Sequence, residues 1–99
     1  MRVRFTPASQ WDIGDIYDAI APHNPAAAER VEQYIRKTAL DLAQFPLVGV
    51  ATDVEEVRRL PLVRYPFTLF YRVSALEDAV EILRVVRSSR VKRLGSIPE

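Results

Sequence analysis

The feature that most restricts the fold of this chain is a change in the spacing of its apolar residues. In residues 7–45 apolar side chains recur three and four positions apart, which is the period of an amphipathic helix. In residues 57–87 they recur at every second position, which is the period of a strand with one buried face. The sequence therefore predicts helices first and strands afterwards, as in a two-layer α+β domain.

Proline residues divide the helical segment into two helices. Thr6 and Asn24 are suitable N-cap residues, and a proline follows each of them at the first helical position. Pro22 and Pro25 prevent a single helix from running through both segments. Because the connection is short, we expect an antiparallel two-helix hairpin whose second helix ends at Phe45–Pro46. The apolar stripes are Ile13, Ile16, Tyr17 and Ile20 in the first helix and Ala27, Ala28, Val31, Tyr34, Ile35, Ala39 and Leu42 in the second.

Four segments are predicted to be strands. "MRVRF" at the N-terminus reads as a short strand with Val3 and Phe5 on its buried face, and "PLVGVATDVEE" reads as a loop. The later strands are "VRRLPLV", "YPFTLFYRVS" and "AVEILRVVR", and Pro61 in the first of these indicates an edge or a bulge. We therefore predict a single domain spanning residues 1–99, with an N-terminal strand, the helix hairpin and a three-stranded antiparallel β-meander.

Strict alternation assigns the faces of the last two strands. In the first of them, it predicts one face made of Phe67, Leu69, Tyr71 and Val73 and another made of Thr68, Phe70 and Arg72. In the last strand, it predicts one face made of Val80, Ile82, Arg84 and Val86 and another made of Leu83, Val85 and Arg87.

Several kinds of chemistry lack the residues they require. The chain has no cysteine and one histidine, so it offers no disulfide, no thiolate metal site and no cysteine nucleophile. No glycine-rich phosphate loop occurs, and Asp12, Asp15 and Asp18 are interpreted as the solvated face of the first helix. We expect no cofactor and no bound metal. No apolar run approaches the ~18 residues of a membrane span, and the lack of cysteine suits the cytoplasm.

The charge is distributed unevenly between the two halves of the chain. Residues 1–56 contain five Lys and Arg against nine Asp and Glu, whereas residues 57–99 contain nine against four. Such asymmetry indicates an acidic partner for the second half, with chance scatter as the alternative. Arginines on adjacent strands could bind phosphate, stabilise a phosphoryl-transfer transition state, receive an acidic peptide, or pair internally with Asp53, Glu55 or Glu56.

Taken together, the sequence resembles the RelE/ParE superfamily of toxins from bacterial type II toxin–antitoxin modules. The resemblance rests on "TPAS", "NPAAAERVEQYI", "FPLVG", "VRRLPL", "YPFTLFYRV" and "VEILRVVRSSR", which occur in the family's order and span nearly the whole chain. It implies a toxin that a cognate antitoxin neutralises, in a toxin–antitoxin hetero-oligomer. RelE-like members cleave mRNA on the ribosome without a metal, and ParE-like members poison DNA gyrase.

The residues that match RelE-type roles are incomplete. Arg58, Arg84, Arg87 and Arg90 could contact phosphate, and Tyr71 could serve as acid or base if arginines lowered its pKa. The tail "SSRVKRLGSIPE" has neither the tyrosine nor the histidine that RelE-type nucleases place there, and Arg87 stands where many ParE-like sequences have histidine. We therefore favour a gyrase-directed toxin, with a ribosome-dependent endoribonuclease or a non-toxic antitoxin-binding module as alternatives.

Partner contacts are expected on the helices and on the basic strands. We expect an antitoxin segment over the hairpin groove, over the sheet edge at Val57–Val63, or over both. The predicted partner-binding residues are Tyr17, Tyr34, Arg58, Arg59, Arg72, Arg84, Arg87 and Arg90.

Overall fold

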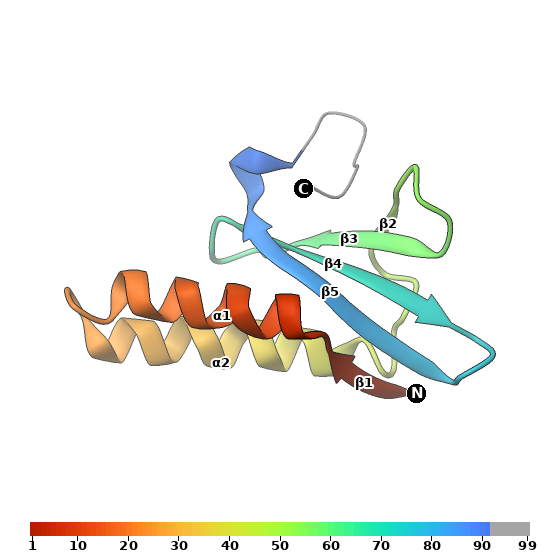
Figure 1. The fold of residues 1–99 in the computed structure, drawn as a ribbon, viewed down its shortest axis with the longest axis horizontal. Coiled ribbons are helices and arrows are strands. Elements are labelled where there is room, and N and C mark those ends of the chain that lie inside the picture. Colours follow the sequence, from red (N-terminus) through yellow and green to blue (C-terminus); the bar gives the residue numbers. More distant parts are fainter. Residues whose placement is uncertain (92–99) are drawn as a thin grey trace.

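The computed structural model describes residues 1–91 as one sheet with a helix pair on one side of it (Figure 1). The elements in chain order are β1 (Arg2–Phe5), α1 (Pro7–Ile20), α2 (Pro25–Asp41), β2 (Val50–Ala51), β3 (Val57–Pro61), β4 (Phe67–Ser74), β5 (Ala79–Arg87) and the 3₁₀ turn η1 (Ser88–Arg90). The predicted α+β class, with its helix hairpin and antiparallel meander, is confirmed. Neither helix in this part of the chain is long and apolar enough to cross a membrane.

Within residues 1–91 the sheet has five strands in the order β1-β5-β4-β3-β2. β1 lies parallel to β5, and the other neighbours are antiparallel. Val50 and Ala51 were predicted to be loop, but they form β2 and pair with Arg59 and Arg58 of β3. Pro61 therefore lies at the end of β3, beyond the two residues that β2 covers, and β2 provides the sheet edge.

Both helices begin at the residues that the sequence indicates. Thr6 Oγ1 accepts a hydrogen bond from the Ser9 amide at 3.1 Å, and Asn24 Oδ1 accepts one from the Ala27 amide at 3.0 Å. A proline follows each cap, where its missing amide hydrogen costs nothing. α2 ends at Asp41, one turn before the predicted boundary at Phe45–Pro46.

The main core lies between the helices and the sheet. Its buried residues are Ile13, Val31, Ile35, Ala39, Leu42, Leu62, Phe67, Leu69, Tyr71, Val80, Ile82 and Val85. The predicted faces of β4 are confirmed, because Phe67, Leu69 and Tyr71 are in this core while Phe70 belongs to a second cluster. That second cluster, on the other face of the sheet, consists of Val57, Phe70 and Val86 with Leu83 and Val91 packed against it.

A bulge in β5 changes the predicted faces of that strand. Tyr71 pairs with Ile82 and Phe70 pairs with Arg84, so Leu83 is an extra residue between them. As a result Val85, not Val86, joins Val80 and Ile82 in the helix-covered core. The predicted faces were wrong beyond Ile82, because strict alternation cannot anticipate an inserted residue.

Candidate partner-binding cleft between helix α1 and strand β5

A cleft lies where α1 crosses the end of β5. β1 ends at Phe5, which pairs with Ile82, so from Leu83 onward no strand within residues 1–91 pairs with the outer edge of β5. The cleft has a volume of about 290 Å³ and opens beside this edge. It is lined by Asp12, Asp15, Ile16, Ala19, Ile20, Phe67, Arg84, Val85, Val86, Arg87 and Arg90. The cleft therefore has an acidic wall on α1, a basic wall on β5 and η1, and an apolar floor.

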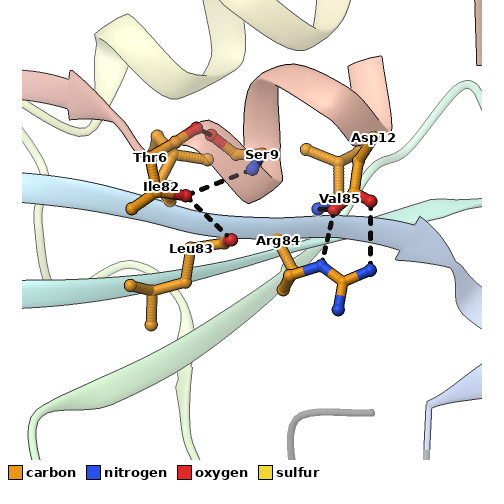
Figure 2. A network of polar contacts seen from close by, with 7 residues as sticks. All are labelled: Thr6, Ser9, Asp12, Ile82, Leu83, Arg84 and Val85. Carbon is orange, nitrogen blue, oxygen red and sulfur yellow. Dashed lines mark hydrogen bonds and ion pairs between the residues drawn. The ribbon is translucent and has the colours of Figure 1, made fainter. Parts of the chain in front are cut away.

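The start of α1 satisfies the first free backbone groups of the β5 edge (Figure 2). The Thr6 amide donates to the Ile82 carbonyl at 3.1 Å. Thr6 Oγ1 lies 2.9 Å and 3.0 Å from the carbonyl oxygens of Ile82 and Leu83. Ser9, which is fully buried, donates its hydroxyl to the Thr6 carbonyl at 2.8 Å. This network fixes the first turn of α1 against the bulge.

Asp12 continues this edge contact and neutralises Arg84. Its carboxylate accepts from Arg84 Nε at 2.7 Å, from Arg84 Nη2 at 3.0 Å and from the Val85 amide at 2.9 Å (Figure 2). The Asp12 side chain is only 14% exposed, so its interpretation as part of a solvated face was wrong. The hydrogen bonds that Arg84 donates to Asp12, more than the charge of that carboxylate, raise the pKa of Arg84 against the opposing effect of burial. Arg84 is therefore a paired structural cation.

Arg87 and Arg90 carry the unpaired positive charge of the cleft. Both side chains belong to exposed residues, and the Arg87 guanidinium lies 5.5 Å from the centre of the Phe67 ring, within cation–π distance. Within residues 1–91 neither arginine forms an ion pair with an acidic side chain. Lys92 and Arg93, which also contribute to the basic sequence, lie outside the described residues.

Arg58 on β3 and Tyr71 on β4 do not line the cleft. Their side chains bind the loop before β2 instead. The Tyr71 hydroxyl donates to the Pro46 carbonyl at 2.8 Å and accepts from the Gly49 amide at 2.9 Å. Arg58 Nη1 donates to the Gly49 carbonyl at 2.7 Å. Burial raises the pKa of Tyr71 more than the Gly49 amide and the Arg58 charge lower it. This direction is opposite to the one that an acid–base role at neutral pH requires.

Replacing Tyr71 with phenylalanine should lower the free energy of unfolding by about 1–3 kcal/mol, because Gly49 and Pro46 lose their partner. A raised pKa in the folded state means that the native protein binds more protons than the unfolded chain above the ordinary tyrosine pKa of about 10. The stabilisation is present below that pH and is lost as the pH rises through the folded-state pKa. Urea unfolding between pH 7 and 11 should show a steeper alkaline loss in the wild type than in Tyr71→Phe, and equal slopes would contradict the assignment.

The other predicted partner residues are dispersed. Arg72 pairs with Glu81 at 3.5 Å, and Arg59 and Arg72 lie on the sheet face that the helices leave uncovered. The ring of Tyr34 packs edge-on against Tyr65 with centroids 5.3 Å apart, and Tyr17 is half-buried on α1. The structure thus brings Arg84, Arg87 and Arg90 together and leaves the remaining candidates elsewhere.

Two features of the surface were missed in the sequence. The sequence around Asp12 does not indicate its pairing with Arg84, because Arg84 lies 72 positions further along the chain. The segment "FPLVGV" exposes Phe45, Leu47, Val48 and Val50, each by more than half, although an apolar run in a loop is a readable sign of a docking surface. Among the described residues, no group of three or more His, Cys, Asp or Glu side chains is arranged to hold a metal ion.

The fold is a small α+β domain that known toxin structures share. The toxin-containing chromosomal ParDE system of P. aeruginosa has a chain that is 30% identical, with a TM-score of 0.76 over 88% of this chain and 95% of that one. A chain of the RelBE2 toxin–antitoxin complex of Mycobacterium tuberculosis is 27% identical, with a TM-score of 0.64 over 87% and 95%. The isolated RelE toxin of E. coli shares the fold at 11% identity, with a TM-score of 0.65 over 87% and 82%.

The family is given by the sequence itself. Residues 3–92 match the family described as the ParE toxin of the type II toxin–antitoxin system parDE. The chain belongs to this ParE toxin family, within the RelE/ParE superfamily. No curated protein matches the sequence significantly.

Proposed function

We propose that this ParE-family toxin inhibits growth by poisoning DNA gyrase in the cytoplasm, and that a cognate antitoxin neutralises it in a hetero-oligomer. The observation that carries the choice of target is that neither a tyrosine nor a histidine lines the cleft beside Arg84, Arg87 and Arg90 in the described part of the chain. RNA cleavage would need both a free cation for the phosphate and a general acid or base, the latter worth roughly 10²–10⁴ in rate.

The alternative, ribosome-dependent mRNA cleavage, is favoured by one observation. Arg87 and Arg90 are exposed beside the cleft and are free to contact phosphate. Tyr71, the residue that the sequence offers for acid–base chemistry, is fully buried. Its hydroxyl group binds Pro46 and Gly49 of the loop before β2. We therefore rank cleavage second.

An antitoxin partner is supported by the relatives and by the surface. The ParDE and RelBE2 structures are of toxin–antitoxin systems. In this chain Phe45, Leu47 and Val48 expose an apolar surface next to β2, the edge strand. Exposed apolar patches and open sheet edges are both suited to receive a partner chain.

Purified toxin should block the supercoiling of relaxed plasmid by DNA gyrase when it is added in amounts comparable to the enzyme. When the antitoxin is mixed with the toxin first, supercoiling should be preserved, and this mixture is the matched control. Undiminished supercoiling at a large molar excess of folded toxin would contradict the gyrase target. Unimpaired growth of cells that express the toxin without its antitoxin would leave the non-toxic binding module as the remaining interpretation.

A further inference from the structure

The contact between Asp12 and Arg84 separates the arginines of the cleft into two kinds. Arg84 gives its Nε and Nη2 to one carboxylate, in the two-point geometry that an external carboxylate or phosphate would use. The same carboxylate also receives the Val85 amide, so it is tied to the backbone of β5 as well. Asp12 thus occupies the place beside Arg84 where an external anion would bind.

Arg87 and Arg90 remain available on the same wall of the cleft. Phe67 supports the Arg87 guanidinium at 5.5 Å, which restricts the side chain without neutralising it. Arg90 follows on η1, where it is exposed. An anion that enters the cleft would therefore meet these two guanidinium groups and an apolar floor that includes Ile16, Ile20 and Phe67.

The acidic wall limits which anions fit. Asp15 and the Asp12–Arg84 pair line the same cleft, and a dense polyanion such as nucleic acid would bring its charges close to the exposed Asp15 carboxylate. A peptide with separated carboxylates and apolar residues between them suits the mixed lining better. Asp12 itself shows that a carboxylate fits an arginine at this edge.

We propose that Asp12 is a positioning residue that withdraws Arg84 from partner binding, and that Arg87 and Arg90 form an anion-binding rim for carboxylate side chains of the antitoxin. The partner in this inference rests on the proposed function, but the division of the arginines is a property of the toxin alone. If the toxin does not inhibit gyrase, the distinction between paired Arg84 and free Arg87 and Arg90 still stands. If all three arginines bind anions equally, the result with gyrase is not affected.

The division is tested with inorganic phosphate as the probe, followed through the Nε–H signals of ¹⁵N-labelled arginine in the free toxin. In the wild type, phosphate should shift the signals of Arg87 and Arg90 and leave that of Arg84 unchanged. In Asp12→Asn, which retains a carbonyl oxygen for the Val85 amide, the Arg84 signal should shift too, and the phosphate affinity should rise about three- to tenfold. A gain in affinity is a result that simple loss of structure does not produce. A shift of Arg84 in the wild type, or equal affinities, would overturn the division.

If Asp12→Asn does not fold, Arg84→Gln and Arg87→Gln provide the comparison with Asp12 in place. Arg87→Gln should weaken phosphate binding about threefold or more, because one of two binding cations is removed. Arg84→Gln should weaken it by less than about twofold, through the repulsion of the uncompensated Asp12 carboxylate alone. Equal losses in the two variants would overturn the proposal.

The proposed contact of Arg87 and Arg90 with antitoxin carboxylates is tested on the toxin–antitoxin complex. The double substitution Arg87→Glu and Arg90→Glu should weaken antitoxin binding about tenfold or more and reduce its dependence on salt, whereas Arg84→Gln should change it less than about twofold. If the double substitution leaves the antitoxin affinity unchanged, the assignment of Arg87 and Arg90 to antitoxin carboxylates is overturned. The same assignment is overturned if a mixed-sequence oligonucleotide displaces phosphate from Arg87 and Arg90 at micromolar concentration.

Discussion

Phe70→Ala should lower the free energy of unfolding by about 3–5 kcal/mol, the usual cost of removing a buried aromatic ring. Phe70 has no exposed surface, although it lies on the sheet face that the helices do not cover. It is the centre of the second cluster, with Val57 and Val86, and its cross-strand neighbours are Arg59 and Arg84. Leu83 and Val91 pack against the same cluster.

The measurement is urea unfolding of the purified toxin, and the total stability of a domain of this size is roughly 5–15 kcal/mol. Phe45→Ala is the matched control, because Phe45 is 64% exposed and its loss should change the free energy by less than about 0.5 kcal/mol. Similar costs for the two variants would show that the second cluster contributes little to the core.

Two glycines should respond to alanine in opposite directions. A Cβ at Gly49 would lie 2.6 Å from Tyr71 Oη and 2.7 Å from the Arg59 carbonyl oxygen. The carbonyl belongs to the backbone of β3 and cannot move without disturbing its pairing. Gly49→Ala should therefore cost about 2–4 kcal/mol, through overpacking and the loss of the Tyr71 hydrogen bonds.

Gly14 is the matched control for this prediction. It lies inside α1, and a Cβ there would meet no atom within 4 Å. Gly14→Ala should therefore raise the free energy of unfolding by about 0.5–1 kcal/mol through helix propensity alone. Thermal and urea unfolding of both variants would check the pair, and a tolerated Gly49→Ala would contradict the close approach of Tyr71 to the loop.

Local chemistry made much of the fold predictable. Thr6 and Asn24, each with a proline after it, marked both helix starts at the residues observed. The two-residue period of β4 put Phe67, Leu69 and Tyr71 on one face, and the structure buries that face in the main core. These signals lie within a few residues of the structure that they specify, so no knowledge of the tertiary fold was needed to read them.

The features that the sequence did not reveal depend on distant contacts. β2 forms because Val50 and Ala51 meet β3, and two residues are too few to show a period. The bulge at Leu83 follows the pairing of β5 with β4. Asp12 was interpreted as solvated because its partner lies on another element, yet this pairing decides which arginines of the candidate site are free.

The site was therefore predictable as a set of cations but not as an arrangement. The sequence placed Arg84, Arg87 and Arg90 at the end of the last strand, and the structure places them beside one cleft. Their exposure and pairing separate a structural arginine from two that face the solvent. A target other than RNA is supported by the buried, hydrogen-bonded hydroxyl of Tyr71 and by the lack of a tyrosine or histidine among the described residues that line the cleft.

The gyrase target is most directly tested by presenting DNA gyrase and translating ribosomes to one preparation of folded toxin. At equal toxin concentrations, DNA gyrase should lose its supercoiling activity, while primer extension on translated mRNA should show intact transcripts. The antitoxin should reverse the effect on gyrase. Toxin-dependent cuts in the mRNA, lost in Arg87→Ala, together with unaffected gyrase, would contradict the account.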